Sequence, residues 1–118
     1  MSESIIYNKA LTFSLNVIPI YKQLVLDKEF VLSKQLLKAA TSIGANVSEA
    51  RYAQSTKDFI SKMHIALKEA NETVYWLDIL QMSNYIDKIT YNKLNLDVNE
   101  IKKILIQIIR TSKNNANV

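Results

Sequence analysis

The chain has 118 residues, of which 48% are hydrophobic and 22% are charged, and its net charge is +4 at pH 7. This length supports one domain, the single glycine and single proline disfavour a turn-rich β architecture, and the lack of cysteine excludes disulfides, thiolate metal sites and cysteine nucleophiles. No apolar run approaches the roughly 20 residues of a membrane span, and the N-terminus lacks the pattern of a signal peptide, so we expect a cytoplasmic protein.

Two helices are predicted in the first half of the chain from hydrophobic residues that recur every three or four positions. The first runs from about Glu3 to Leu26, and Pro19 inside it predicts a kink or a break near residues 17–18. The second runs from about residue 30 to residue 52. The residues expected on the apolar faces are Ile6, Leu11, Leu15, Ile18 and Val25 in the first helix, and Leu32, Leu36, Ala39, Ala40, Ile43 and Val47 in the second.

Two further helices are predicted in the second half. Ser55 opens the third, because STKD pairs a hydroxyl N-cap with an acidic residue three positions later, a relative of the capping box. Asp87 caps the fourth helix, which ends at about Ser112 and leaves residues 114–118 as a frayed polar tail. Because the connections are short, neighbouring helices are antiparallel, and we predict an all-α, antiparallel up-down-up-down four-helix bundle over residues 1–113.

Polar residues lie on or beside the apolar face of the second helix. Asn46 falls on the apolar seam, while Gln35, Ser42 and Glu49 repeat every seven residues along one flank. We interpret Asn46 as a buried amide that fixes helix register. The alternatives are a small polar site for a partner or ligand and a solvated flank. Lys62 or His64 on the third helix could face Glu49.

Gly44, the only glycine, lies inside the second helix and off its main seam. A glycine in a helix interior costs about 1 kcal/mol relative to alanine. We therefore expect another backbone, from this chain or from another subunit, to pack closely against it.

Tyr75 and Trp76 are adjacent in the third helix, so both cannot face one core. One ring is therefore free for a subunit interface, where an aromatic ring with a polar tip is favoured. The alternatives are that it covers the end of its own core or stacks on nucleic-acid bases.

The positive charge is concentrated near one end of the predicted bundle. Residues 1–100 hold eleven basic and eleven acidic side chains, whereas the last eighteen residues hold four basic ones and no acid. In the predicted topology this end also receives the connection between the second and third helices. The candidate phosphate contacts are Arg51, Lys57, Lys102, Lys103, Arg110 and Lys113, and the alternative is a solvated face.

Nothing in the sequence indicates a catalytic, cofactor or metal site. His64 is the only histidine, and the Glu-x-x-His pairs of di-iron bundles are absent. We expect a non-enzymatic protein without a cofactor.

Two stretches, LKAATSIGANVSEA and STKDFISKMHIALKEANETVYWLDIL, resemble the bacterial family of four-helix-bundle proteins encoded by intervening sequences in 23S rRNA genes. The chain departs from that pattern at Ala50, where the family has glycine, and at Leu37–Lys38, where a basic pair is common. The positions that match are Ala40, Ser42, Ile43, Ala45, Asn46, Glu49, Phe59, Ile60, Ile65, Ala66, Glu69, Glu72, Thr73, Tyr75, Trp76 and Leu77.

The resemblance implies a homopentamer, and a related branch is the basic pentameric accessory protein of diversity-generating retroelements. We therefore expect a self-assembling protein that binds structured RNA, or an RNA-associated protein, through its basic end. The alternatives are a protein-binding adaptor and an accessory factor of a reverse transcriptase, neither with direct RNA contact.

Overall fold

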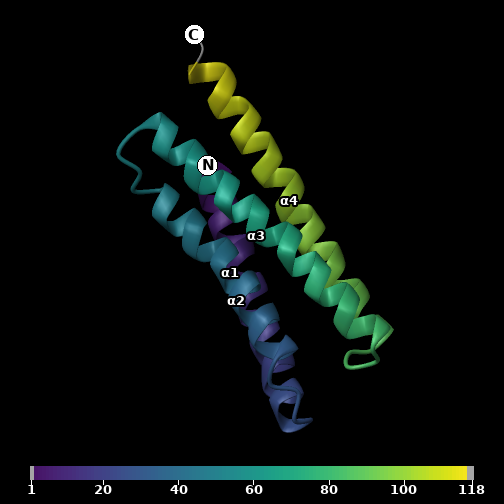
Figure 1. Cartoon of the computed structure of the whole chain (residues 1–118). Coiled ribbons are helices and arrows are strands. Elements are labelled where there is room, and N and C mark those ends of the chain that lie inside the picture. The colour runs from purple at the N-terminus through teal and green to yellow at the C-terminus, as the bar shows by residue number, and fades with distance from the viewer. Residues whose placement is uncertain (1, 117–118) are drawn as a thin grey trace.

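The computed structural model describes residues 2–116, with side chains from Ser4 onward, and contains four helices (Figure 1). They are α1 (Ser2–Leu26), α2 (Leu32–Ala50), α3 (Thr56–Met82) and α4 (Lys88–Ala116). The described part of the chain contains no strand. The molecule is a rod of 52 × 22 × 19 Å, and none of these helices is long and apolar enough to cross a membrane.

Each helix packs antiparallel against the next one, and α4 returns to contact α1, as predicted for an up-down-up-down bundle. The contact between α2 and α3 is the largest of the four and that between α1 and α4 is the smallest. One end of the rod gathers the start of α1, the α2–α3 connection and the end of α4 (Figure 1). At the other end the two hairpin turns lie apart, so the α1–α2 and α3–α4 pairs diverge there.

The predicted caps of α3 and α4 are both present. The Ser55 hydroxyl accepts a hydrogen bond from the Asp58 amide at 3.0 Å, and the Asp58 carboxylate accepts one from the Gln54 amide at 3.2 Å. At the start of α4 the Asp87 carboxylate accepts a hydrogen bond from the Thr90 amide at 2.7 Å. That bond holds the pKa of Asp87 below its usual value, because it favours the ionised carboxylate.

The start of α2 differs from the prediction by two residues, because Glu29 acts as an unforeseen cap. Its buried carboxylate accepts hydrogen bonds from the amides of Leu32 at 3.0 Å and Ser33 at 2.8 Å. These amides have no partner within the helix, and a carboxylate there also complements the positive end of the helix dipole.

The two hairpin turns end their first helices in the same way. Lys28 and Asn84 have φ angles of 64° and 66°, in the left-handed region. In each turn the next residue's amide reaches back five positions, from Glu29 to the Leu24 carbonyl at 2.9 Å and from Tyr85 to the Leu80 carbonyl at 2.8 Å. This is the Schellman arrangement, which normally places glycine at the left-handed position.

The predicted apolar face of α1 is only partly correct. The buried residues are Ile6, Ala10, Phe13, Val17 and Leu24, whereas Leu11 and Leu15 are 44% and 58% exposed. The helix continues through Pro19 without a break. The prediction failed because α1 is apolar on two sides, and the positions of α2 and α4 decide which side is buried.

The last helix is longer than predicted. It continues from the expected end at Ser112 to Ala116, so residues 114–116 of the proposed tail are helical. Asn117 and Val118 lie outside the described residues.

Candidate functional site

Lys57 and Lys113 lie at the end of the rod where α1 begins and α4 ends. They line an open hollow of about 480 Å³ between the start of α3 and the end of α4, together with Thr56, Ile60 and Ala116. Arg110 and Lys103 are exposed further along α4, and Lys102 is half-buried. The structure therefore brings Lys57 together with Lys113 and arranges the other three cations along α4.

Arg51 occupies a different position at the same end. Arg51 directly follows α2. Its guanidinium carbon lies 3.8 Å from the centre of the Tyr7 ring of α1 and 5.7 Å from the centre of the Tyr52 ring. A guanidinium over an aromatic face is held by cation–π attraction and can still offer its N–H groups to a phosphate.

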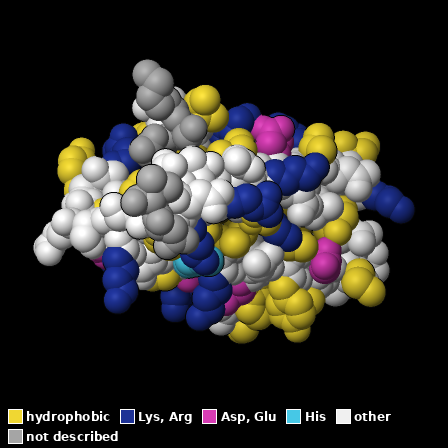
Figure 2. Space-filling model, turned by 90° about the horizontal axis from the view of Figure 1, so that it is seen from above, with side chains coloured by type: hydrophobic (Ala, Val, Ile, Leu, Met, Phe, Trp, Pro, Cys, Tyr) yellow, Lys and Arg dark blue, Asp and Glu magenta, His cyan; other side chains and the backbone are white. Residues whose placement is uncertain are grey.

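The candidate phosphate contacts of this end form no ion pair closer than 4 Å with the described acidic side chains. Within the described side chains, the ion pairs closer than 4 Å are Lys9–Glu100 and Lys62–Glu49, and neither involves the candidate phosphate contacts. Figure 2 looks down onto this end and shows Lys and Arg side chains at many points of the surface, with Asp and Glu side chains beside some of them. A set of cations outside ion pairs can attract a polyanion without breaking existing ones.

The polar residues Ser42 and Asn46 of α2 bond within their own helix, and Asn46 is less buried than we predicted. Its amide nitrogen donates to the Ser42 carbonyl at 2.8 Å, and the Ser42 hydroxyl donates to the Lys38 carbonyl at 2.6 Å, so both bonds stay within α2. Asn46 is half-buried, and Val47 beside it is buried as predicted. Gln35 is exposed.

Glu49 has the partner that the sequence suggested. Its carboxylate lies 3.6 Å from the ammonium nitrogen of Lys62 on α3, which links the ends of two neighbouring helices, while His64 is exposed on the same helix. The pair is partly exposed, so its contribution to stability is small.

Gly44 packs against α1, as expected for a close approach of two helices. A methyl group built on Gly44 lies 3.5 Å from Cβ of Ala10 and 3.6 Å from its carbonyl carbon, which are ordinary van der Waals distances. The fold of one chain therefore leaves room for alanine at this position.

Tyr75 and Trp76 face different sides of α3, as predicted from their adjacent positions. Trp76 packs partly against the core, and its indole N–H donates to Glu72 at 3.2 Å, while Tyr75 is 57% exposed. Tyr91 belongs to a separate contact, where its hydroxyl donates to Asp78 at 2.6 Å and joins α4 to α3. That bond to a carboxylate raises the pKa of Tyr91, because it favours the protonated phenol.

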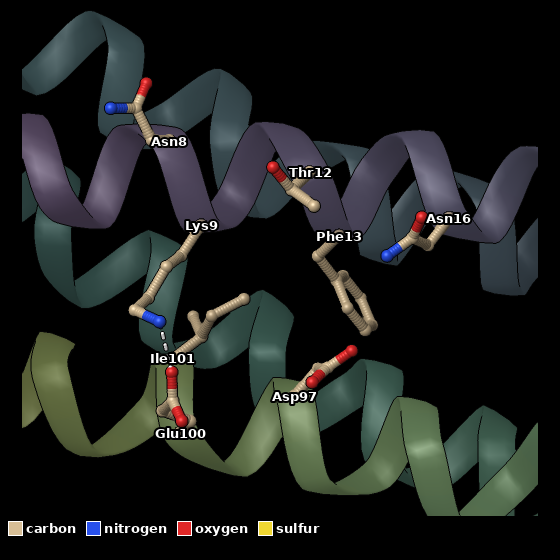
Figure 3. Close-up of a pocket in the computed structure, with 8 residues that line it drawn as sticks. All are labelled: Asn8, Lys9, Thr12, Phe13, Asn16, Asp97, Glu100 and Ile101. Carbon is tan, nitrogen blue, oxygen red and sulfur yellow. Dashed lines mark hydrogen bonds and ion pairs between the residues drawn. The ribbon is translucent and has the colours of Figure 1, made fainter.

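A further hollow, not anticipated from the sequence, lies between α1 and α4 (Figure 3). It measures about 270 Å³, with Phe13 and Ile101 as its apolar part and polar side chains around them. Lys9 forms an ion pair with Glu100 across it, which leaves Asp97 as the acid without an ion-pair partner in the described hollow. Hydrogen bonding to a small polar molecule is the chemistry this arrangement allows. Asn8, Thr12 and Asn16, spaced by four residues, were the sequence signal for it.

The described residues contain no group of three or more His, Asp or Glu side chains that could hold a metal ion. The described arrangement thus consists of a basic end and a small polar hollow between α1 and α4.

Comparisons with known proteins agree with this fold. A comparison with curated proteins gave no match. One matching solved structure is a protein of unknown function from the S23 ribosomal protein family of Bacteroides thetaiotaomicron VPI-5482. It has 50% sequence identity and a TM-score of 0.91, and the match covers 93% of this chain and 99% of that one. The family model of the 23S rRNA-intervening sequence protein matches residues 2–107. The chain therefore belongs to the 23S rRNA-intervening sequence protein family.

Proposed function

We propose that this protein is a non-enzymatic, self-assembling bundle, a homopentamer, that binds the phosphate backbone of structured RNA through its basic end. The observation that supports RNA binding is the set of cations at this end. Arg110 and Lys113 are exposed, Lys57 shares a hollow with Lys113, and no acid lies within ion-pair distance of them in the described side chains.

The chemistry of these groups predicts the kind of RNA binding. Lysine and arginine on a helix surface attract phosphates whatever the base sequence, and binding releases condensed counterions. Affinity should therefore fall steeply with salt and depend little on sequence. Assembly would strengthen it, because each added copy brings another set of cations to the same RNA.

The test is the affinity for structured fragments of 23S rRNA across a salt series, with protein whose mass in solution is known. The variant Arg110→Gln/Lys113→Gln should weaken binding and reduce the slope of log affinity against log salt by about 0.7 to 0.9 for each phosphate that the protein no longer neutralises. The matched control is Lys22→Gln/Lys34→Gln, which removes the same charge from exposed positions on α1 and α2. Equal weakening by both pairs would show that net charge, not the basic end, governs binding.

A second candidate function, a protein-binding adaptor, is favoured by the exposed ring of Tyr75 beside Trp76. Tyrosine is common at the centre of protein interfaces, where its ring is buried and its hydroxyl finds a partner. No RNA binding even at low salt would leave this candidate, or an accessory role to a reverse transcriptase, as the better explanation.

A further inference from the structure

The hollow between α1 and α4 contains an acid without a cationic partner. Asp97 is half-buried on α4, and within the described side chains it forms no ion pair closer than 4 Å. Figure 3 shows its carboxylate directed toward α1, beside the ring of Phe13 and across from the side chain of Asn16. A carboxylate that is partly withdrawn from water gains from a cationic hydrogen-bond donor, so this position favours a positively charged ligand.

Lys9 is not that partner, because it is engaged one turn away. Its ammonium pairs with Glu100, which lies three residues from Asp97 on the same side of α4. The pair cancels its own two charges and leaves the hollow with the charge of Asp97. The hollow is therefore negative in a chain whose net charge is +4, and it should attract a cation and repel an anion.

Polar groups on the α1 side of the hollow remain available to a ligand. Elsewhere in the bundle such side chains bond to a carbonyl of their own helix, as Asn99 does to the Asn95 carbonyl at 2.7 Å. Within the described residues, the Thr12 hydroxyl and the Asn16 amide form no such bond. They are four positions apart and share the side of α1 that lines the hollow. Their oxygens can accept hydrogen bonds from a donor that Asp97 also holds.

The rest of the hollow limits the size and kind of the ligand. Its volume of about 270 Å³ lies below the roughly 300–1,000 Å³ of pockets that bind drug-sized molecules. Phe13 and Ile101, both buried, form an apolar floor between the polar walls. Such a floor suits the methylene groups of a short aliphatic chain.

We propose that this hollow binds a small aliphatic ammonium ion, that is, a primary amine on a short free chain. The ammonium group donates to the Asp97 carboxylate and to the oxygens of Thr12 and Asn16, while the chain lies on Phe13. A ligand held in this way joins α1 to α4, the two helices with the smallest contact in the bundle. The site depends neither on the RNA binding nor on the self-assembly proposed above.

The first experiment titrates n-butylammonium into the isotope-labelled full chain and follows the backbone amide chemical shifts by NMR. Saturable shifts should be largest near residues 12, 16 and 97, and for a ligand of so few atoms we expect a Kd of roughly 1 mM. The uncharged analogue n-butanol should bind about tenfold more weakly or less, and butyrate, with the opposite charge, should not bind. No saturable shift at these residues, or equal binding of n-butanol, refutes the site.

The variant Asp97→Asn tests the carboxylate, because it keeps the size of the side chain and removes its charge. It should weaken the binding of n-butylammonium by about tenfold and leave the circular dichroism unchanged. The matched control Glu69→Gln removes a charge from another half-buried acid, on α3, and should keep the wild-type affinity. Equal weakening by the two variants would show that net charge, not Asp97, governs binding.

A second variant supplies the ammonium group from the chain itself. Asn16→Lys should reach Asp97 from α1 as Lys9 reaches Glu100, so it should abolish the binding of n-butylammonium and raise Tm by about 1 to 4 °C. The gain in Tm should disappear when Asp97→Asn is added. The control Asn71→Lys adds the same charge at an exposed position of α3 and should change neither property. A folded Asn16→Lys chain that binds n-butylammonium like the wild type contradicts the proposed position of the ligand.

Hydrogen exchange tests whether the ligand joins the two helices. At a ligand concentration about ten times the Kd, amides in the middle of α1 should exchange about tenfold more slowly, because α1 must release the ligand before it opens. Unchanged exchange in α1 would mean that the ligand is held by α4 alone, against the proposal. Tighter binding of Nα-acetyl-lysine methylamide than of n-butylammonium would also overturn it, because the ligand would then be a lysine of a partner protein and not a free amine.

Discussion

At the scale of single residues, Gly44 shows how a sequence signal and a packed structure can differ. Glycine inside a helix indicated that another backbone approaches closely, and Ala10 does lie opposite it. Yet the distances leave room for a methyl group, and its φ angle is not positive. Within one chain, alanine at this position would therefore pack as well as glycine.

Replacing Gly44 with alanine should raise the free energy of unfolding by about 1 kcal/mol, because alanine restricts the unfolded chain and favours the helix. Urea denaturation measures this change. Ser61→Ala, at an exposed position of α3, is the control. There, the higher helix propensity of alanine alone should raise the free energy of unfolding by about half as much. A loss of stability in Gly44→Ala alone would show that α1 and α2 cannot accommodate the added carbon.

At the scale of helices, the ends are determined mostly by short-range hydrogen bonds. Ser55 and Asp87 cap α3 and α4 as their local sequences indicated. Glu29 was missed because its role depends on the turn before it, which brings its carboxylate back to the amides of α2. That turn places Lys28 at a φ of 64°, a conformation that costs a residue with a Cβ about 1 kcal/mol.

Lys28→Gly should therefore stabilise the protein by about 0.5 to 1 kcal/mol, since glycine removes the strain at the left-handed position. Thermal and urea denaturation both report this gain. Asn84→Gly, at the equivalent position of the other hairpin, should gain less because asparagine tolerates this conformation. Lys68→Gly, at an exposed position in the middle of α3, should instead lose about 0.5 to 1 kcal/mol. A neutral or destabilising Lys28→Gly would mean that the lysine side chain supports the turn.

At the scale of the whole molecule, the four helix contacts are unequal. The α2–α3 pair forms the largest contact, and the α1–α4 pair, beside the polar hollow, forms the smallest. Elements with less buried contact open more readily than the rest of a domain. The helices α2 and α3 should therefore be the last to open, and α1 should open before them.

Hydrogen exchange followed by mass spectrometry checks this order. Amides near Ala66 and Ala70, both fully buried on α3, should exchange at the rate of global unfolding, and amides in the middle of α1 should exchange measurably faster. Equal protection in α1 and α3 would show that the bundle opens only as one unit.

The sequence alone determined the four helices, two of their caps and the antiparallel order, because these depend on local spacing and short connections. The resemblance of two stretches to a known family also indicated the family, which the family model then confirmed. It also showed that the positive charge is concentrated near the end of the chain. Lys62 was correctly named as one of two candidate partners of Glu49.

Only the tertiary structure decided which side of α1 is buried, whereas the buried face of α2 was predicted from its periodicity. α1 is apolar on two sides, and the packing of α2 and α4 turns Phe13 inward and leaves Leu15 exposed. On α2, Val47 is buried as predicted, while Asn46, which we also placed on the apolar seam, is half-buried and bonds to its own helix. Periodicity gives the spacing of an apolar row, but the choice between two rows depends on neighbours that are distant in the sequence.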